Sequence, residues 1–420
     1  MTSVLVVGSG GREHALAWKL SLSPRIDKLY VAPGNGGTHS IAVNVPINAA
    51  NIDGLVSFAE KNKIGLTIVG PDNSLALGIV DEFQKRGLRI FGPTRAAAEI
   101  ESSKVFAKRL MKEAGVPTAS FHVFSDYEEA LKHIRYQGAP IVVKASGLAL
   151  GKGVYPCQTL AEAESALAEI MLRRIHGSAG DEVIVEEFLE GQEVSVHAFC
   201  DGKTSVLLPL AHDHKPILNG NQGKNTGGMG TIAPVHYAST DEKQFVKKQI
   251  VGLTLNALRT KKRPFTGMLY PGLIMTKDGP KALEFNARFG DPETQIYMRL
   301  LATDLLDILE ACVDGTLSDL SIEWFSGYAV CVVLASKGYP DLYEKGIPIT
   351  GIASADNLYG VTVFHAGTTY TDALRTSGGR VLNVTATGET LQEATRQAYK
   401  AVQRIHFDGM QYRKDIGESH

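Results

Sequence analysis

The chain has 420 residues, of which 43 are Lys or Arg and 45 are Asp or Glu, so its formal net charge at pH 7 is −2. A protein that binds nucleic acid by neutralising phosphates normally has a basic excess, and a disordered chain has few apolar residues. With 44% apolar residues and almost no net charge, this sequence belongs to neither class and predicts about two to four folded domains.

The sequence further predicts a cytoplasmic protein that makes no membrane contact. Its N-terminal apolar run follows no charged leader and ends at Gly8, so we interpret it as a first strand rather than a signal peptide. No apolar stretch approaches the roughly 18 residues that a membrane span needs. The four cysteines lie far apart without a CxxC pair, which is typical of reduced thiols and not of a zinc site.

Residues 1–103 alternate short apolar runs with segments of helical character. The expected strands cover residues 4–7, 29–32, 66–69 and 88–91, and the expected helices begin near residue 12 and cover residues 52–61 and 75–85. Strands that alternate with helices predict a doubly wound parallel sheet. The turns GSGGREH, APGNGG, GPDNS and FGPT follow these strands, at the edge where such sheets bind ligands.

Three further units follow, so the expected fold class is α/β multidomain. Residues 104–190 alternate helices with short strands and predict a small α+β unit. Residues 191–320 contain four expected strands and two helices, at 194–200, 206–210, 268–275 and 281–286 and at 241–259 and 304–312. Residues 321–420, with alternating apolar positions at 361–366 and 380–386, predict a separate small sheet domain.

Gly10 and Gly11 lie between the first expected strand and the helix that follows it. Backbone amides at a helix N-terminus favour an anion, so this turn is a candidate phosphate site. The pattern is not the dinucleotide fingerprint GxGxxG, because Glu13 takes the place of the third glycine and no acidic residue ends the second strand. The turn therefore indicates either a phosphorylated ligand or a plain tight connection, and it disfavours a nicotinamide oxidoreductase.

A second glycine-rich segment follows Lys144, which ends an apolar strand in the run KASGLALGKGV. A loop with Gly151 and Gly153 can fold its amides over a polyphosphate while Lys152 neutralises charge. It is not a Walker A loop, which would need Ser or Thr after the lysine. The alternative interpretation is a surface hairpin with solvated lysines.

The run VIVEEFLEGQE, residues 183–193, is an apolar strand that leads into acidic residues and a turn. This composition suits a hinge between domains. Its backbone is a candidate to bind an adenine base, and Glu193 is a candidate acceptor for ribose hydroxyls. An ordinary solvated turn is the alternative.

The most specific segment is LEFNARFGDPETQ, residues 283–295. Glu284 and Asn286 stand two residues apart, so on a strand both point to one face and offer two hard oxygen ligands for Mg²⁺ or Mn²⁺. Arg288 lies two residues further on the same face and could neutralise a phosphoryl group during transfer. The segment therefore predicts a metal-assisted phosphoryl-transfer site.

Residues 223–230 read GKNTGGMG and follow Asp213 and Lys215. Four glycines in eight residues predict a loop whose backbone closely approaches a ligand. Asp213, Lys215, Asn225 and Thr226 make a substrate loop the favoured interpretation over a flexible connector.

Taken in order, the segments GGREH, APGN, GPT, KASGLALGKGV, EEFLEGQE, NTGGMG and EFNARFGDPETQ resemble the phosphoribosylamine–glycine ligase family of the ATP-grasp superfamily. The likeness extends from residue 4 to residue 417. It implies a pre-grasp domain over residues 1–103, a lid-like subdomain over 104–190, a catalytic ATP-grasp subdomain over 191–320 and a C-terminal domain over 321–420. The implied reaction joins glycine to 5-phosphoribosylamine with ATP, through glycyl phosphate, in the second step of purine synthesis.

The resemblance also implies residue roles. ATP would contact Lys104, Lys144, Gly151, Lys152, Gly153, Glu186, Glu187, Phe188, Leu189 and Glu193. Glu284 and Asn286 would hold the metal, and Lys144 and Arg288 would act in phosphoryl transfer. The substrates would contact Gly10, Gly11, Asn35, Asp213, Lys215, Asn225, Thr226, Gly227, Gly228, Arg288, Asp291, Glu293 and Thr294. Asp213 is the candidate for the glycine ammonium, and the sugar phosphate is placed at Gly10 and Gly11.

The sequence departs from the family pattern at a few positions. Asp72 stands in GPDNSL where the family usually has GPEAPL, and Ser146 replaces an aspartate in the glycine loop. The alternatives are another ATP-grasp carboxylate–amine ligase, a biotin-dependent carboxylase subunit or a sensor that binds nucleotide without catalysis. A sensor would be expected to lack Glu284 or Lys144, and both are present. Transient contact with the upstream amidotransferase is left open as a further partnership.

Overall fold

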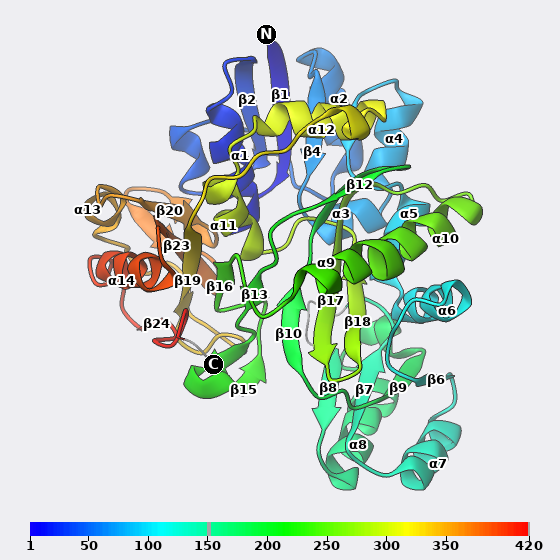
Figure 1. The fold of residues 1–420 in the computed structure, drawn as a ribbon. Coiled ribbons are helices and arrows are strands. Elements are labelled where there is room, and N and C mark those ends of the chain that lie inside the picture. The colour runs from blue at the N-terminus through cyan, green and yellow to red at the C-terminus, as the bar shows by residue number, and fades with distance from the viewer. Residues whose placement is uncertain (149–152, 419–420) are drawn as a thin grey trace.

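The computed structural model describes residues 1–148 and 153–418. The N-terminal region is a parallel sheet in the order β3-β2-β1-β4-β5 (Figure 1). Its strands are β1 (Thr2–Gly8), β2 (Ile26–Pro33), β3 (Val43–Asn44), β4 (Leu66–Val69) and β5 (Ile90–Phe91). Its helices are α1 (Gly11–Ser21), α2 (Ile52–Lys61), α3 (Asp72–Ala76), α4 (Ile79–Lys85) and α5 (Arg95–Ser102). The predicted doubly wound sheet is confirmed.

One expected helix of this region is wrong. Residues 75–85 do not form one helix but belong to α3 and α4, which are separated at Gly78. Gly78 has a φ of 91°, a left-handed conformation that ends one helix and that glycine adopts with little strain. The apolar periodicity continues through this break, so the pattern alone does not reveal it.

The lid-like region is an antiparallel sheet in the order β6-β9-β7-β8, which lies at the far end of the molecule from the N-terminal sheet (Figure 1). Its strands are β6 (Phe121–Phe124), β7 (Ile141–Ala145), β8 (Val154–Cys157) and β9 (Val183–Glu187). Helix α6 (Lys104–Ala114) precedes it, and α7 (Tyr127–Gln137) and α8 (Leu160–Leu167) complete its own small core.

The central region is an antiparallel sheet in the order β10-β17-β11-β12, with β18 paired to β17. Its strands are β10 (Gln192–Ser195), β11 (Ala198–Asp201), β12 (Ser205–Leu207), β17 (Thr266–Thr276) and β18 (Gly279–Asn286). The expected single strand 194–200 is therefore wrong, because it is two strands that pair with different parts of β17. The expected helix 241–259 is α9 (Thr240–Phe245), a π-helical segment (Val246–Gly252) and α10 (Leu253–Thr260).

The C-terminal region has its own sheet, as expected, and this sheet also includes two strands from the central region. Its order is β13-β16-β19-β23-β20, with β24 beside β19. Two of its strands, β13 (His212–Asp213) and β16 (Gly230–Ala233), flank the glycine-rich segment, and the others are β19 (Tyr328–Ser336), β20 (Val361–His365), β23 (Arg380–Gly388) and β24 (Met410–Gln411). The substrate-loop candidate is therefore anchored in a sheet formed mainly by the last hundred residues.

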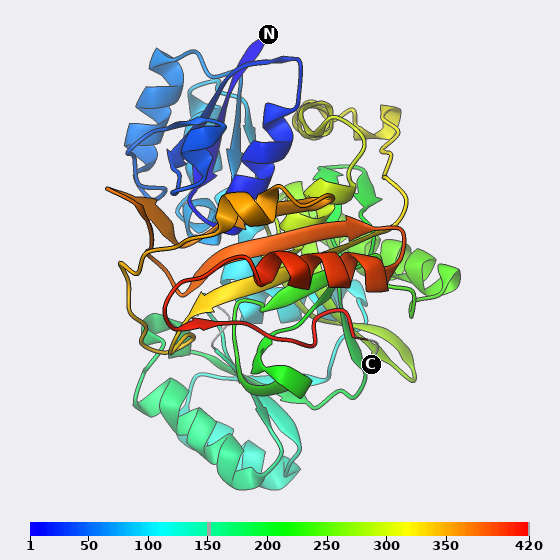
Figure 2. The ribbon, with the colours of Figure 1, turned by 90° about the vertical axis from the view of Figure 1, so that its left-hand side faces the viewer.

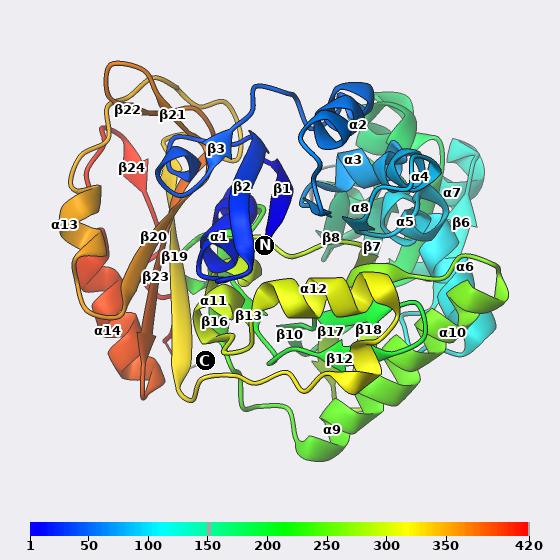
Figure 3. The same ribbon diagram turned by 90° about the horizontal axis from the view of Figure 1, so that it is seen from above.

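Helices join the regions into one body. Helix α14 (Leu391–Val402), which the sequence analysis missed, lies along the C-terminal sheet (Figure 2) and buries Ala394, Ala398 and Ala401. Helices α11 (Glu293–Leu300) and α12 (Leu305–Asp314) share an apolar core with α1, β1 and β19. Seen from above, the C-terminal strands and helices α2 to α5 lie on opposite sides of β1 (Figure 3).

Further short elements include two hairpins and a small helix. The hairpins are β14 (Pro216–Leu218) with β15 (Gln222–Asn225) and β21 (Thr368–Tyr370) with β22 (Leu374–Thr376), and the helix is α13 (Ile352–Asp356). Within the described residues, no helix combines the length and apolar character that crossing a membrane requires.

Candidate functional site

A cavity of about 320 Å³ lies where the lid, the central sheet, the N-terminal helices and the glycine-rich segment meet. It brings together most of the residues singled out from the sequence. Those that line it are Lys104, Lys144, Gly153, Glu186, Glu187, Phe188, Leu189, Glu193, Asp213, Lys215, Asn225, Thr226, Gly227, Glu284, Asn286, Arg288, Asp291 and Glu293. Gly10, Gly11, Asn35, Gly228 and Thr294 do not line it, and Gly151 and Lys152 lie outside the described residues.

Three lysines lie near a single carboxylate at one end of the cavity; we term Lys104, Lys108, Lys144 and Glu186 the lysine end. Lys108 and Lys144 are buried, and Lys104 is half-buried. Lys144 on β7 donates from Nζ to Glu186 Oε2 at 2.8 Å and to the carbonyl of Leu283 at 3.3 Å. Lys108 Nζ lies 3.1 Å from the same carboxylate oxygen. The other oxygen, Glu186 Oε1, is buried without a hydrogen-bond partner among the described residues. The lysine end therefore has a positive excess and one unused acceptor.

Lys104 begins α6 and contacts Ser146 and Gly147, which follow β7. Ser103 caps the helix by accepting from the amide of Phe106, which fixes the first turn beside β7. The amide of Lys104 donates to the carbonyl of Ser146 at 2.7 Å, and its Nζ lies 3.3 Å from the carbonyl of Gly147. Burial lowers the pKa of Lys104 from its ordinary value, although the Glu284 carboxylate opposes this shift.

Glu284 and Asn286 lie in the middle of the cavity, on β18. Their partners across β17 are Gly272 and Tyr270, so both side chains occupy the same face of the hairpin. Burial disfavours a charge on Glu284, but Lys215, Lys104 and Lys144 together hold its pKa below the ordinary value. The carboxylate is thus ionised near neutral pH, the state that a metal ligand requires.

Arg288 is held beside this pair by a residue that the sequence analysis missed. Its guanidinium lies 3.1 Å from Glu101 Oε1 and donates to Asn286 Oδ1 at 3.1 Å. Glu101 is buried at the end of α5, and its second oxygen accepts from the amide of Ala287 at 2.8 Å. Glu101 thereby fixes both the backbone after β18 and the direction of the guanidinium.

The other end of the cavity is acidic; we term Asp213, Asp291 and Glu293 the carboxylate end. Glu293 accepts hydrogen bonds from Tyr270 at 2.6 Å and from Ser195 at 2.9 Å. Asp213 Oδ1 is buried and has no hydrogen-bond partner in the described part of the chain. Burial and the nearby Glu293 carboxylate raise the pKa of Asp213 well above its ordinary value.

Lys215 lies between the two ends, on the segment that follows β13. It forms an ion pair with Glu193 at 2.9 Å. Burial opposes the charge of Lys215, but Glu193 and Glu284 raise its pKa above the ordinary value. The predicted ribose acceptor is therefore already paired with the predicted anion-binding lysine, and a ligand must share or replace that contact.

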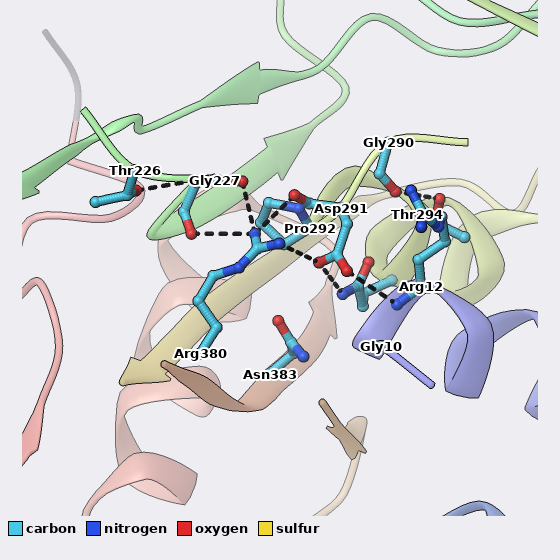
Figure 4. Close-up of polar contacts among 12 residues, drawn as sticks. Gly10, Arg12, Thr226, Gly227, Gly290, Asp291, Pro292, Thr294, Arg380 and Asn383 are labelled. Carbon is cyan, nitrogen blue, oxygen red and sulfur yellow. Dashed lines mark hydrogen bonds and ion pairs between the residues drawn. The ribbon is translucent and has the colours of Figure 1, made fainter. Parts of the chain in front are cut away.

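In the turn before α1, which was the expected phosphate site, backbone amides already donate hydrogen bonds to carboxylates (Figure 4). The amide of Gly10 donates to Glu13 Oε2 at 2.6 Å, and the amide of Arg12 donates to Asp291 Oδ2 at 3.4 Å. Two carboxylates thus stand at this helix N-terminus, where they are favourable for the same reason as a phosphate. The placement of the sugar phosphate at Gly10 and Gly11 stays a prediction, and it requires these carboxylates to move.

Asn35 and Thr294 have structural hydrogen bonds outside the cavity. Asn35 donates to the carbonyls of Ser9 and His365, at 2.9 and 2.8 Å, and its Oδ1 accepts from the amides of Gly37 and Thr38. The hydroxyl of Thr294, which is fully buried, donates to the carbonyl of Gly290 at 2.5 Å. Their predicted substrate contacts remain predictions.

Three family models match successive parts of the chain. They describe the N domain of phosphoribosylglycinamide synthetase, which matches residues 2–101, its ATP-grasp (A) domain, which matches residues 102–294, and its C domain, which matches residues 329–419.

Individual proteins agree with these models. A phosphoribosylamine–glycine ligase from Rhodopirellula baltica is 48% identical over 424 aligned residues, which cover 99% of this chain and 97% of the relative. The crystal structure of phosphoribosylamine–glycine ligase from Thermotoga maritima matches with a TM-score of 0.86 and 35% identity, over 98% of this chain and 99% of that one. The biotin carboxylase domain of a Hydrogenobacter thermophilus 2-oxoglutarate carboxylase, solved with MgADP, shares the fold at a TM-score of 0.72 and 16% identity, over 98% and 91% of the two chains. The chain therefore belongs to the phosphoribosylglycinamide synthetase family, an ATP-grasp family whose members are named phosphoribosylamine–glycine ligases.

Proposed function

We propose that this chain ligates glycine to 5-phosphoribosylamine with conversion of ATP to ADP and phosphate, in purine synthesis. The observation that carries the proposal is one cavity that is lined by the lysine end, the pair Glu284 and Asn286, and the carboxylate end. Glu284 interacts with Lys104 and Lys144 on one side and with Lys215 on the other, and Lys215 in turn interacts with Asp213. This order matches an anionic nucleotide, a transferring phosphoryl group and an amine-bearing substrate. Within the same proposal, the protein is cytoplasmic and receives the labile amine through transient contact with the amidotransferase that produces it.

ATP occupies the lysine end in this proposal. Lys104 and Lys144 neutralise the phosphates, and Gly151, Lys152 and Gly153 are further proposed contacts of ATP. Residues 186–189 surround the adenine, where the unpartnered Oε1 of Glu186 can accept from an amino group. Glu193 receives the ribose hydroxyls when Lys215 shares its contact.

Glu284 and Asn286 fit a divalent cation. They offer a carboxylate and an amide oxygen, the donor type that Mg²⁺ and Mn²⁺ both accept, so the residues do not separate the two metals. Within the described residues, no group of three or more His, Cys, Asp or Glu side chains is arranged to hold a metal. Glu284 and Asn286 would therefore supply the protein's ligands to the cation. When bound, it neutralises phosphate charge during transfer.

The reaction needs an activated carboxylate, because oxide is too poor a leaving group for direct attack by an amine. Transfer of the γ-phosphoryl group to a carboxylate oxygen of glycine yields glycyl phosphate and ADP. The amine of phosphoribosylamine then attacks the acyl carbon, the bond to the phosphate oxygen breaks, and the nitrogen loses a proton as phosphate leaves. Arg288 faces the transferred group and stabilises its charge, while Lys144 holds the donor phosphates.

The glycine ammonium binds at Asp213 in this proposal. Asp213 Oδ1 is the buried acceptor without a partner at the carboxylate end, and a cationic donor satisfies it. Lys215, Asn225, Thr226, Gly227 and Gly228 form the adjoining wall. The phosphoribosylamine lies next to Asp291, Glu293 and Thr294, with its phosphate toward Gly10, Gly11 and Asn35 once the carboxylates at that turn have moved.

The test is ADP release by the purified protein with Mg²⁺ and ATP. Glycine and phosphoribosylamine, formed in place from ribose 5-phosphate and ammonia, are added separately and together. We expect ADP release only when both are present, with N-glycyl ribosylamine phosphate as the product. ADP release that ignores glycine would contradict the proposal and favour another ATP-grasp carboxylate–amine ligase.

A further inference from the structure

Arg380 lies at the first position of β23 and extends from the C-terminal sheet to Gly227 and Asp291, two residues that line the cavity (Figure 4). Its Nη1 donates to the carbonyls of Gly227 at 2.6 Å and Asp291 at 2.7 Å, and lies 3.4 Å from the carbonyl of Gly228. Its Nη2 lies 3.4 Å from Asp291 Oδ1. One guanidinium thus joins two loops that are more than sixty residues apart in the chain.

The first of these loops is pressed against Asp213. Gly228 has a φ of 109°, and a Cβ atom there would lie 2.5 Å from Pro292 Cδ and 2.6 Å from Asp213 Oδ1. At such distances only a glycine fits, so the backbone of the loop itself forms the surface beside that carboxylate. A side chain at Gly227 would meet the guanidinium carbon of Arg380 at 3.0 Å. The position of the loop therefore depends on Arg380 from one side and on Pro292 from the other.

The second loop connects three regions of the molecule. Asp291 precedes α11, accepts from the amide of Arg12 on α1, and accepts from Gln295 Nε2 at 3.0 Å. Arg380 adds the C-terminal sheet to this set of contacts. Its side chain is only 20% exposed, and a charge at that depth requires the carbonyl and carboxylate partners that it has.

Arg380 is also the cation that faces the carboxylate end from the C-terminal side. Lys215, the second cation that interacts with Asp213, is paired with Glu193. Without Arg380, the carboxylates of Asp213, Asp291 and Glu293 would share the cavity wall with one fewer positive charge, and two loop carbonyls would lose their donor.

We propose that Arg380 is a positioning residue for the amino-acid subsite, where it holds the Gly227–Gly228 backbone against Asp213 so that this carboxylate receives the glycine ammonium. The inference rests on the proposed placement of glycine at Asp213. It gives the C-terminal domain a defined part in binding, through a residue that itself touches no reacting atom. A lysine is not equivalent at this position, because a single ammonium cannot span the separated carbonyls that the planar guanidinium reaches.

The test compares Arg380→Ala and Arg380→Gln with the wild type and with Arg375→Ala. Arg375 is a matched control, since it lies on the C-terminal domain and pairs with the exposed Asp372. We expect the KM for glycine to rise about 10- to 100-fold in both Arg380 variants, the loss expected for one or two charged hydrogen bonds. The KM for ATP should stay within about twofold, and millimolar guanidinium should restore part of the glycine affinity of Arg380→Ala.

A second measurement does not depend on the identity of the substrate. Amide hydrogen exchange in a peptide that contains residues 226–229 should be faster in the Arg380 variants and unchanged in Arg375→Ala. Unchanged exchange, or equal rises in the KM values for glycine and ATP, would overturn the inference. Faster exchange with an unchanged KM for glycine would also overturn it. If the wild type itself releases ADP without glycine, the proposed function fails instead, and that result is obtained before any variant is compared.

Discussion

The two ends of the cavity differ in how they balance charge. At the lysine end, one carboxylate oxygen of Glu186 serves both Lys144 and Lys108, so positive charge remains for a ligand. At the carboxylate end, Glu293 is satisfied by neutral hydroxyls, and Asp213 keeps an unpartnered oxygen. Each end thus lacks the charge that its proposed ligand brings, phosphates at one and an ammonium at the other. The charges of the two ends are therefore complementary to the charges of the proposed substrates.

Glu284 lies at the boundary between the two ends, where its carboxylate interacts with Lys104, Lys144 and Lys215. Glu284→Ala should lower turnover by at least about 10²- to 10³-fold, because the ligand of the proposed cation and the counter-charge of three lysines are lost together. The measurement is ADP release with both co-substrates, accompanied by circular dichroism to show that the variant is folded. Asp278→Ala is a suitable control, since Asp278 is exposed at the turn of the same hairpin. Full activity in folded Glu284→Ala would remove the metal assignment.

The carboxylate end is tested by Asp213→Asn, which keeps the size of the side chain and removes its charge. We expect the KM for glycine to rise about 10- to 100-fold with little change in the KM for ATP, since a charged hydrogen bond contributes about 1.5–3 kcal/mol. The pH dependence has a definite sign. Burial and Glu293 raise the pKa of Asp213, so acidification should protonate this carboxylate and weaken glycine binding in the wild type. The KM for glycine of Asp213→Asn should not change over the same pH range. A parallel pH profile in both proteins would exclude Asp213 as the ammonium acceptor.

Sequence patterns predicted the site residues that lie in motifs at strand ends. They missed the residues that only tertiary packing brings to the site. Lys144 and Glu284 were identified because a charged side chain ends or interrupts an apolar strand. Glu101, Lys108 and Arg380 carry no such local mark, since their roles arise from contacts with partners far away in the chain. These partners are Ala287 for Glu101, Glu186 for Lys108, and Gly227 and Asp291 for Arg380. The one available signal was that Lys108 follows Lys104 by four positions, which puts both on one face of a helix.

The fold shows the same limit. The parallel N-terminal sheet follows from alternating strands and helices, and it was predicted. The C-terminal sheet takes β13 and β16 from the central region, and two- to four-residue strands in a glycine-rich segment have no readable alternation. The carbonyl that Arg380 binds in Gly227 lies between these two strands. The contact of Arg380 with Gly227 therefore could be recognised only from the three-dimensional structure.

The ion pair between Glu101 and Arg288 allows a second test of the region between the two ends of the cavity. Glu101→Gln keeps a side chain that can accept from the amide of Ala287 but removes the charge that pairs with the guanidinium. We expect turnover to fall about tenfold with a nearly unchanged KM for ATP, because Arg288 then loses its orientation rather than its charge. Glu99→Gln is the matched control, since Glu99 lies on the same helix and pairs with Arg263 near the surface. Equal effects of the two substitutions would mean that α5 acts only through stability.

The smallest expected effect concerns the stability of the lysine end and its dependence on pH. Burial lowers the pKa of Lys108 to about 8 from the ordinary 10.5, although the Glu186 carboxylate opposes the shift. Between these values the unfolded chain binds more protons than the folded one, so the free energy of unfolding rises with pH as the cost of the buried ammonium disappears. Urea midpoints of the wild type and Lys108→Met at pH 7.5 and 9.5 measure this contribution. The urea midpoint of the wild type should rise relative to that of Lys108→Met when the pH is raised from 7.5 to 9.5.

The control is Lys112→Met, because Lys112 is exposed and lies one turn further along α6. The difference between its urea midpoint and that of the wild type should be the same at both pH values. If Lys108→Met behaves like that control, burial does not lower the pKa of Lys108, and Lys108 then contributes its full positive charge to the lysine end.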